Sequence, residues 1–428
     1  MTPNLIELTI DSLAFGGAGV GRRDGKAVFV HRAYPGDVTQ VRVEKEKKRY
    51  AEAALVKIIS PSPSRQPPPC PLAPDCGGCV WMGLEYQEQL KWKQTILKEQ
   101  LRRIGGLDVA VGQTTPSPLQ LGYRARIRLK TAVDGGHVAV GYQRHHSNDI
   151  VDVAGCPVAN PLVNAILKQA AAFLKTSPDQ AASVSGMDIE TDSKGVRGRI
   201  TLRMDKPPKS GFMESFLAAC PSAAGLAAVH HGEISRLGET NLSMETAGGM
   251  ELTSGPTVFS QVNPLQNVRI VEKVLELAAA GEGGNALDLY CGMGNISLPM
   301  AASGAAVTGV ESSREAVICA ASNAERLSIR TAGFVEGDST PAANRMADED
   351  LKFSVVVINP PRAGAREALG AVARLSRGRI VYVSCDPATL ARDAAELSKA
   401  GFAMVSASPF DMFPHTSHLE TVALFERS

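Results

Sequence analysis

The stretch Asp288-Leu-Tyr-Cys-Gly-Met-Gly-Asn295 joins an apolar strand pattern to a helical pattern through a glycine-rich turn. Another helical pattern, over residues 266–280, precedes it. Further strands are predicted at residues 306–310, 355–358, 380–383 and 421–425. Buried strands that alternate with helices form a parallel sheet covered by helices on both faces. The C-terminal part of the chain, residues 259–428, is therefore expected to be a doubly wound α/β domain.

The glycine turn indicates which kind of cofactor this domain binds. Its spacing is G-x-G, and the third glycine of a dinucleotide turn is missing because position 297 is Ser. Sites for S-adenosylmethionine use the same strand, turn and helix, and glycines let the backbone approach the ligand. Glu311 ends the following strand, where an acid binds ribose hydroxyls, and Asp338 lies where a contact to adenine is expected. The order of the turn and the two acids predicts an S-adenosylmethionine site.

A cysteine and a glutamate lie downstream in the same domain. Cys385 ends the apolar run of residues 380–384 and is followed by the turn dipeptide Asp386-Pro387. The carboxyl ends of strands are where α/β sheets place reacting groups. A thiolate is a good nucleophile and a good leaving group, and Glu420 is a candidate base. We therefore expect group transfer through a covalent enzyme intermediate, with Cys385 as the nucleophile and Glu420 as the general base.

The tetrapeptide Asn359-Pro-Pro-Arg362 follows the predicted strand at residues 355–358 and offers an alternative chemistry. Asn-Pro-Pro followed by an aromatic residue is associated with methylation of exocyclic amines. Arg362 takes the place of that aromatic residue, so the motif supplies no stacking platform. The pattern weakens an amine-methylation interpretation and leaves room for methylation of carbon.

Four cysteines in the first half of the chain form a candidate ligand set. Cys70, Cys76 and Cys79 are spaced C-x5-C-x2-C, and Cys156 follows in a Gly-Cys-Pro sequence. In a reducing compartment such cysteines are expected to be metal ligands and not disulfides. Zinc and a [4Fe–4S] cluster both accept four thiolates, and Pro157 after the fourth cysteine leans slightly towards iron–sulfur. The alternative is that Cys156 is merely a buried residue.

The N-terminal residues 4–59 alternate short apolar strands with Gly and Asp turns. Five short strands in this length, with a glycine-rich corner at residues 15–21, are typical of a small β-barrel. The run Lys45-Glu-Lys-Lys-Arg-Tyr50 lies on one predicted hairpin. Barrels of this kind bind oligonucleotides through basic grooves, although a solvated loop is the alternative for the run alone. The proline-rich stretch at residues 61–69 then indicates a domain boundary.

Charge is unevenly distributed, although the net charge is only +1. Residues 1–150 contain 21 Lys and Arg against 14 Asp and Glu, whereas the remainder contains 24 against 30. A basic front favours contact with a polyanion, with chance variation as the alternative. Arg124, Arg126 and Arg128 alternate along one predicted strand, so they suit either phosphate contact or a solvent-exposed sheet face.

Length and composition describe a globular protein of two or three domains, with 44% hydrophobic and 21% charged residues. No apolar run is long enough for a transmembrane helix. The N-terminus lacks a charged region followed by an apolar one, so no signal peptide is predicted. We therefore expect a cytoplasmic location.

Together, these motifs resemble those of the bacterial RNA (uracil-C5)-methyltransferases, especially the iron–sulfur type that methylates uridine in 23S rRNA. The resemblance covers nearly the whole chain. It implies a multidomain α/β protein with a TRAM- or OB-like β-barrel at residues 1–60 that binds RNA, and a central α+β domain at residues 61–258. A Rossmann-like, S-adenosylmethionine-dependent methyltransferase domain is expected at residues 259–428. The resemblance also implies a [4Fe–4S] cluster held by Cys70, Cys76, Cys79 and Cys156.

The same resemblance assigns roles in the C-terminal domain. Ser384-Cys-Asp-Pro-Ala-Thr-Leu390 matches the nucleophile motif, and Pro414-His-Thr-Ser-His-Leu-Glu420 matches the base motif. Two positions depart from the family: Asn359 stands where Asp is usual, and Asp338 stands where the ribosomal enzymes often have Asn. An amide can donate where a carboxylate only accepts, so contacts at position 359 are expected to be rearranged. The implied cofactor contacts are Gln261, Tyr290, Asn295, Glu311, Asp338 and Asn359.

The implied reaction is methylation of uridine C5 after addition of Cys385 to C6. Ribosomal RNA is the favoured substrate and transfer RNA is the alternative; no membrane contact and no obligatory protein partner are expected. Two other functions stay open on sequence alone. They are amine methylation through Asn359-Pro-Pro, with Cys385 inert, and an RNA-binding or iron–sulfur protein without catalysis.

Overall fold

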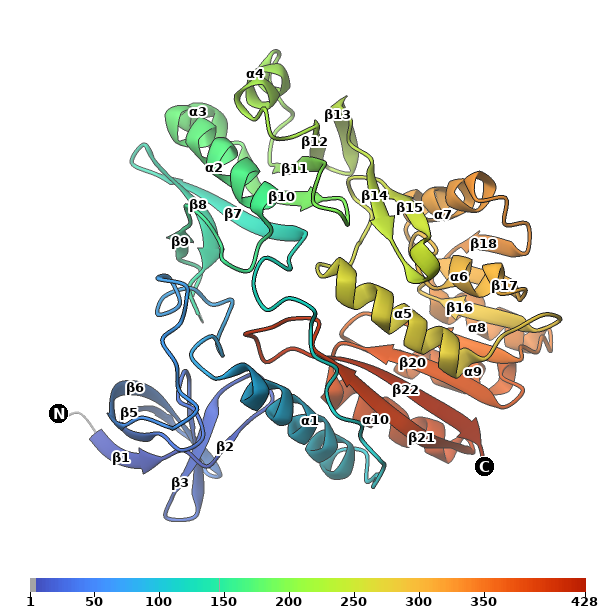
Figure 1. Ribbon diagram of the computed structural model, residues 1–428, viewed down its shortest axis with the longest axis horizontal. Helices are drawn as coiled ribbons and strands as arrows, with labels where there is room; N and C mark the ends of the chain where they lie inside the picture. The colour runs from blue at the N-terminus through green and yellow to red at the C-terminus, as the bar shows by residue number, and fades with distance from the viewer. Residues whose placement is uncertain (1–4, 146) are drawn as a thin grey trace.

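The computed structural model describes residues 5–145 and 147–428, and Figure 1 shows its three large sheets along the chain. The N-terminal sheet has the strand order β1-β5-β6-β4-β3-β2. Alternate residues such as Leu8, Val30 and Val41 point into its core, which is why these short segments form strands. The β-barrel expected at residues 1–60 corresponds to this sheet, of which the structure describes the part from Leu5 onwards. Its strands are β1 (Leu5–Thr9), β2 (Ser12–Leu13), β3 (Gly19–Arg23), β4 (Lys26–Val30), β5 (Val38–Glu46) and β6 (Tyr50–Ser60).

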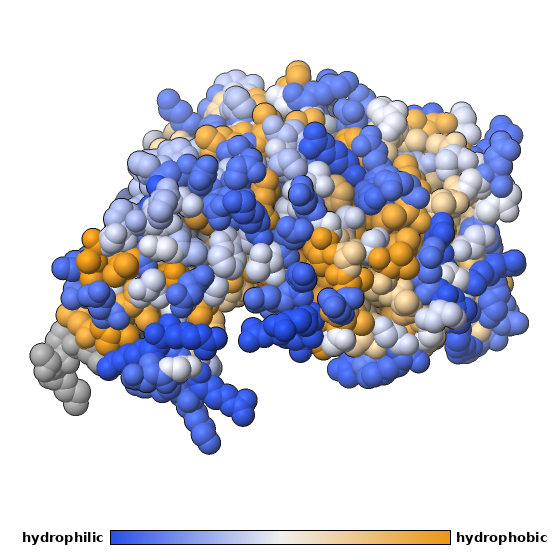
Figure 2. Space-filling model, turned by 60° about the horizontal axis from the view of Figure 1, so that its bottom comes forward, coloured by the Kyte–Doolittle hydropathy of each residue, from blue (hydrophilic) through white to orange (hydrophobic). Residues whose placement is uncertain are grey.

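The glycine corner of this sheet needs its glycines. A Cβ atom on Gly19 would lie 2.3 Å from the carbonyl oxygen of Ala33, and one on Gly21 would lie 2.3 Å from that of Thr9. The basic run at residues 45–50 spans the turn between β5 and β6, and its side chains are largely exposed. Figure 2 shows hydrophilic side chains projecting from this N-terminal lobe, beside the grey residues, and a hollow between the lobe and the rest of the molecule.

The central sheet has the order β13-β12-β11-β10-β7-β8-β9. Helix α2 packs against it through apolar residues at helical spacing, including Val163, Ile166 and Leu174. Helix α1 instead contributes Leu97 and Leu101 to a different core cluster. The elements are α1 (Tyr86–Arg103), β7 (Arg126–Asp134), β8 (His137–Gln143), β9 (Ile150–Asp152), α2 (Pro161–Thr176), α3 (Pro178–Ala181), β10 (Val184–Thr191), β11 (Gly198–Met204), α4 (Phe212–Ala219), β12 (Gly225–His230), β13 (Glu233–Gly238), β14 (Leu242–Glu245), η1 (Ala247–Gly249) and β15 (Glu251–Ser254).

Two of the three arginines predicted to share one strand face have a common partner on the neighbouring strand, whereas Arg124 donates to the Tyr123 hydroxyl at 3.2 Å. Arg126 and Arg128 of β7 both donate to the Asp188 carboxylate, at 3.0 Å each, and Arg203 of β11 donates to it as well. Arg124 lies just before β7. Three cations around one anion leave this face with a net positive charge.

The C-terminal sheet has the order β18-β17-β16-β19-β20-β22-β21 (Figure 1). Strands β16, β17, β18, β19 and β20 are parallel to one another. Strand β22 runs antiparallel to both β20 and β21. This confirms the predicted doubly wound domain. Its elements are α5 (Pro264–Ala278), β16 (Asn285–Leu289), α6 (Ser297–Ala302), β17 (Ala306–Glu311), α7 (Arg314–Arg326), β18 (Ala332–Glu336), α8 (Ser339–Asp348), β19 (Val355–Ile358), η2 (Arg366–Ala368), α9 (Leu369–Leu375), β20 (Arg379–Ser384), α10 (Pro387–Lys399), β21 (Phe402–Phe410) and β22 (Glu420–Arg427).

Helix α1 of the central part belongs structurally to the helix layer of the C-terminal sheet. Its Leu97 and Leu101 are buried in one core cluster with Leu390 of α10, Phe402 of β21 and residues of α8 and α9. Helices α5 and α6 cover the opposite face through residues such as Val271. None of the helices in the described ranges combines the length and the apolar character that a membrane crossing requires.

Candidate active site

Cys385 lies directly after β20, at the junction with α10. The Asp386 carboxylate caps α10 by accepting a hydrogen bond from the Thr389 amide at 2.8 Å. The Ser384 hydroxyl accepts from the Asp386 amide at 3.2 Å and donates to the Asp386 carbonyl at 3.0 Å. The half-buried thiol therefore sits on a short, well-braced turn at the carboxyl end of a central strand.

Glu420 begins the neighbouring antiparallel strand, β22. In the β20–β22 ladder Ser384 is paired with Thr421, so extending the register by one residue places Cys385 opposite Glu420. Directly opposed residues of antiparallel strands have Cα atoms about 4.5–5.5 Å apart. The thiol and the carboxyl group are 35 positions apart in sequence, but strand pairing makes them neighbours.

Burial controls the protonation of both groups. Loss of solvent raises the pKa of Glu420, which is 5% exposed, to about 8, and the positive charge of Arg362 opposes the rise. Burial and then the charge of Glu420 raise the pKa of Cys385 to about 11, again opposed by Arg362. The pKa of His418 falls to about 4 because burial and then Arg362 disfavour its cation. Arg362 is therefore close enough to influence all three groups.

The predicted cofactor turn has the strained backbone that such turns require. Tyr290, Gly292 and Gly294 have φ values of 66°, 58° and 90°, and a non-glycine residue rarely adopts a positive φ. The Glu311 carboxylate accepts from the Gly292 amide at 3.1 Å and from the Ser313 amide at 2.8 Å. Glu311 thus ties the turn to the start of the next helix.

A buried acid holds the base of the same turn. Asp288 at the end of β16 accepts a hydrogen bond from the Ser297 hydroxyl at 2.5 Å. Burial raises the pKa of Asp288 to about 7, so its carboxyl group takes up a proton far more readily than an exposed aspartate. This bond fixes the first turn of α6 against the strand.

One pocket brings together four of the six predicted cofactor contacts. Asn295 within it exchanges two hydrogen bonds of 3.0 Å with Asn267 of α5. The other two predicted contacts do not line this pocket. Glu311 contacts the Gly292 amide of the turn, and Asp338 caps α8 by accepting from the Thr340 amide at 3.1 Å. The lining includes Gln261, Tyr290, Asn295 and Asn359 together with Phe259, Asn267 and Gly292.

The comparisons with known proteins agree with this geometry. The sequence family tRNA (Uracil-5-)-methyltransferase matches residues 250–428, and the TRAM domain matches residues 4–56. The 23S rRNA (uracil(1939)-C(5))-methyltransferase RlmD of Alkalilimnicola ehrlichii is 35% identical over 98% of this chain and 96% of that protein. RlmD of Aeromonas hydrophila is 35% identical over 99% of this chain and 97% of that protein.

The chain belongs to the RlmD-like family of RNA uracil-C5 methyltransferases. Among solved structures, the Pyrococcus abyssi tRNA (uracil-54, C5)-methyltransferase in complex with S-adenosyl-L-homocysteine superposes with a TM-score of 0.74. The two chains are 26% identical, and the match covers 98% of this chain and 100% of the other. The N-terminal TRAM domain and the C-terminal methyltransferase fold predicted from sequence are confirmed.

In this RlmD-like chain the four predicted ligand cysteines also meet. Cys70, Cys76, Cys79 and Cys156 line one cavity of about 220 Å³, together with Tyr142 and other residues. No three His, Cys, Asp or Glu side chains in the described ranges lie close enough to share a single metal ion. Thiolates are the ligands that both zinc and iron–sulfur clusters accept, so the donor set suits either group.

Some residues of this RlmD-like site were missed by the sequence analysis. Arg362 was considered only as the residue that replaces the aromatic residue of the amine-methylation motif, although its charge lowers the pKa of both the nucleophile and the base. His418 stands within the base motif itself, two residues before Glu420. Asn267 and Phe259 line the cofactor pocket, and Phe259 is 67% exposed. Only their closeness to recognised motifs could have indicated these residues.

Proposed function

We propose that this protein transfers a methyl group from S-adenosylmethionine to C5 of one uridine in 23S rRNA, through a covalent bond between Cys385 and C6. The observation that carries the proposal is the pairing of a thiol and a buried carboxyl group at adjacent strand ends, beside a methyltransferase cofactor turn. Relatives at 35% identity over nearly the whole chain are named as 23S rRNA enzymes, which favours ribosomal over transfer RNA. The same relatives favour carbon methylation over amine methylation and over a protein without catalysis.

Cys385 starts the reaction because uracil C5 is a poor nucleophile. Addition of its thiolate to C6 pushes electron density onto C5 and O4, which makes C5 carbanion-like. The bound cofactor supplies an electrophilic methyl group. Arg362 favours the thiolate, since its charge lowers the pKa of Cys385 against the effect of burial.

Glu420 completes the reaction by taking the C5 proton. The new bond at C5 leaves that carbon saturated, and its proton must leave before the C6–sulfur bond can break. With a pKa of about 8, the Glu420 carboxylate is a much stronger base than an exposed glutamate. Removal of the proton restores the C5–C6 double bond and expels the Cys385 thiolate.

The cofactor contacts follow from the lining of the pocket. Gln261, Tyr290, Asn295 and Asn359 offer side chains to it, so we propose them as direct contacts. Glu311 accepts two backbone amides and retains lone pairs for ribose hydroxyls at the edge of the turn. Asp338, at the first turn of α8, is proposed to reach the adenine. Asn359 adds a donor where the family usually has a carboxylate.

The four cysteines are proposed to hold a [4Fe–4S] cluster with a structural role. The reaction has no redox step, and Cys79 and Cys156 pack in one apolar cluster with Met82, Tyr123 and Val158. The proposed cluster can be tested by iron and sulfide content after anaerobic purification, with about four of each expected per chain. Cys76→Ser should lower the iron and sulfide contents and the melting temperature. Full occupancy with one zinc ion instead would overturn the assignment.

RNA is proposed to approach the hollow between the N-terminal lobe and the rest of the molecule (Figure 2). The basic β5–β6 turn and the Arg126–Arg128–Arg203 group offer positive charge for its backbone. The target uridine has to leave any helix, because the thiol must reach C6 from the ring face. Ribosomal RNA as substrate implies a cytoplasmic site of action.

The decisive experiment is nucleoside mass spectrometry of ribosomal and transfer RNA from cells that lack this protein. Loss of one 5-methyluridine from 23S rRNA is expected, with recovery by the wild-type gene and not by Cys385→Ala. Loss confined to transfer RNA would overturn the substrate assignment. Recovery by Cys385→Ala, or failure of the enzyme to be trapped covalently on RNA containing 5-fluorouridine, would overturn the mechanism.

A further inference from the structure

The segment that leads to Glu420 is an irregular loop whose polar contacts come largely from α1 and from the region around the four cysteines. This segment, residues 411–419, connects β21 to β22 and is called the base loop below. Phe410 pairs with Glu420 in the β21–β22 ladder, so the residues that flank the loop on its two sides are paired with each other. Any change in the position of the loop is therefore transmitted directly to the proposed base.

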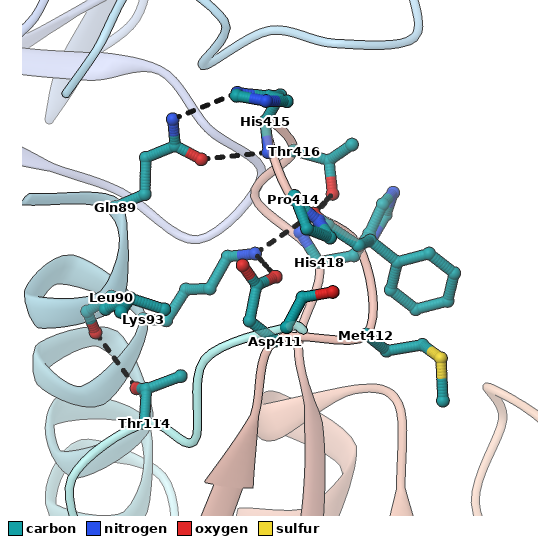
Figure 3. Close-up of polar contacts among 12 residues, drawn as sticks. Gln89, Leu90, Lys93, Thr114, Asp411, Met412, Pro414, His415, Thr416 and His418 are labelled. Carbon is teal, nitrogen blue, oxygen red and sulfur yellow. Dashed lines mark hydrogen bonds and ion pairs between the residues drawn. The ribbon is translucent and has the colours of Figure 1, made fainter. Parts of the chain in front are cut away.

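A buried ion pair anchors the start of the base loop to α1. Lys93 Nζ lies 2.5 Å from an Asp411 carboxylate oxygen, and both side chains are 0% exposed (Figure 3). The same Nζ donates to the Phe413 carbonyl at 3.1 Å. Buried ion pairs add little net stability because both charges lose their water, but they fix geometry, and breaking one is costly. Asp411 follows Phe410, the ladder partner of Glu420.

A side-chain amide of α1 holds the middle of the base loop. Gln89 accepts from the His415 amide at 2.8 Å, and its own amide lies 3.3 Å from His415 Nδ1 (Figure 3). The same amide donates to the Leu84 carbonyl at 2.7 Å, so Gln89 is itself fixed. His415 has a φ of 68°, a left-handed conformation that needs such support in a residue other than glycine.

Further contacts close the remaining sides of the base loop. The Trp81 amide donates to the His415 carbonyl at 2.9 Å, and the Tyr123 hydroxyl donates to the Pro414 carbonyl at 3.2 Å. These two contacts come from the region around the four cysteines. The C-terminal domain holds the loop as well, because Asn263 donates to the Met412 carbonyl at 3.3 Å and Met412 and Leu419 are buried in the cores of its sheet. The polar contacts of Lys93 and Gln89 are nevertheless separate from the hydrogen bonds that brace the turn at Cys385.

We propose that Lys93 and Gln89 are positioning residues for Glu420, which hold the base loop so that the carboxylate faces the C5 proton. The inference rests on the proposed function, because it assigns these residues to one step of that reaction. Neither residue supports the braced turn at Cys385, so their loss should spare addition to C6 and methyl transfer. Proton removal should slow, and the methylated RNA should stay bound to the enzyme.

The test compares variants of α1 on unmodified 23S rRNA from the deletion strain. Lys93→Met with Asp411→Asn removes both buried charges and leaves no unpaired ion, so it should destabilise the fold less than loss of either partner alone, which thermal unfolding checks. Gln89→Leu tests the second anchor separately. Lys91→Met is the matched control, because Lys91 lies on the same helix, is 69% exposed and pairs with Glu88 at the surface.

Each variant is assayed for turnover and, on denaturing gels, for the methylated covalent enzyme–RNA adduct. We expect turnover to fall about tenfold to a hundredfold for both anchor variants. The rate of adduct formation should stay within about twofold of wild type while the adduct accumulates, and Lys91→Met should behave like wild type. Unchanged turnover, or an equal fall of turnover and adduct formation, would refute positioning. Methylation of the same RNA by Cys385→Ala would instead refute the proposed function.

Discussion

Replacing Glu420 by Gln should abolish turnover and at the same time stabilise the folded protein in a pH-dependent way. Burial raises the pKa of this carboxyl group from 4.5 to about 8. A group whose pKa is raised on folding contributes stability below its unfolded pKa and loses it as the pH rises through the folded pKa. The free energy of unfolding of the wild-type protein should therefore fall between pH 4.5 and pH 8. The Glu420→Gln variant should not show this fall, because glutamine does not titrate.

The size of the effect follows from the two pKa values. Each pKa unit corresponds to about 1.4 kcal/mol, so the full loss reaches about 5 kcal/mol above pH 9. Between pH 6 and pH 9.5, the advantage of Glu420→Gln should grow by about 3 kcal/mol. For a domain of this size that corresponds to roughly 6–12 °C in melting temperature.

The assay is thermal unfolding of both proteins in matched buffers across that pH range. Glu426→Gln is the control, because Glu426 lies on the same strand with a side chain that is 42% exposed. Its melting temperature should track wild type at every pH. A constant gap between wild type and Glu420→Gln over the whole range would refute the reasoning, since it would mean that the carboxyl group titrates as it does in water.

Three other perturbations have expected outcomes. Arg199→Met should destabilise the protein by about 3–5 kcal/mol in chemical denaturation, because it strands the buried Glu190 carboxylate 2.5 Å away, and adding Glu190→Gln should recover most of the loss. Gly309→Ala should weaken S-adenosylmethionine binding about tenfold by calorimetry, since the new Cβ would lie 2.7 Å from Phe334 and 2.9 Å from Cys291 at the cofactor turn. Gly333→Ala is the control and should bind the cofactor normally, because a Cβ there meets nothing within 4 Å. The turnover rate should rise with pH through about 8, because the raised pKa values of Glu420 and Cys385 leave both groups protonated at lower pH; a rate that falls over this range would contradict their assigned roles.

Sequence predicted the C-terminal sheet well but missed two of its strands. β18 contains Ala332 and Gly333 and is only partly buried, so it lacks the apolar signal of an inner strand. β21 is interrupted by a bulge between Met404 and Ser406 and contains Pro409, which breaks the alternation that identifies strands. Strands with a continuous apolar run, such as β19 and β20, were predicted nearly to the residue.

No strand of the central sheet beyond residue 153 was predicted from the sequence, and buried polar residues explain the omission. β10 carries Asp188, Glu190 and Thr191 at buried positions, where a hydrophobic pattern would place apolar side chains. Their partners, such as Arg199 on β11, come from the neighbouring strand. A pattern of single residues cannot show that a buried acid is satisfied by an arginine on another strand.

The roles of Lys93 and Gln89 were likewise invisible in the sequence. Both lie on a helix more than 300 residues before the base loop that they contact. Within α1 they are two polar residues among many, and only the packing of α1 onto the C-terminal sheet shows that they face inwards. The nucleophile and the base, by contrast, lie in short sequence motifs that can be recognised without the structure.

A single cause connects the strength of the base with the anchoring of its loop. A carboxylate removes a C5 proton best when its pKa lies near the working pH, and burial is what raises the pKa of Glu420 to that range. The same burial makes the ionised side chain costly to the folded state, so an unrestrained loop would swing the carboxylate towards water. Anchors that are themselves buried, such as Lys93 with Asp411, resist this movement because leaving the interior would expose or separate their own charges. The base therefore stays strong only while the loop is held. This is why loss of the α1 contacts should both slow proton removal and return the pKa of Glu420 towards its ordinary value.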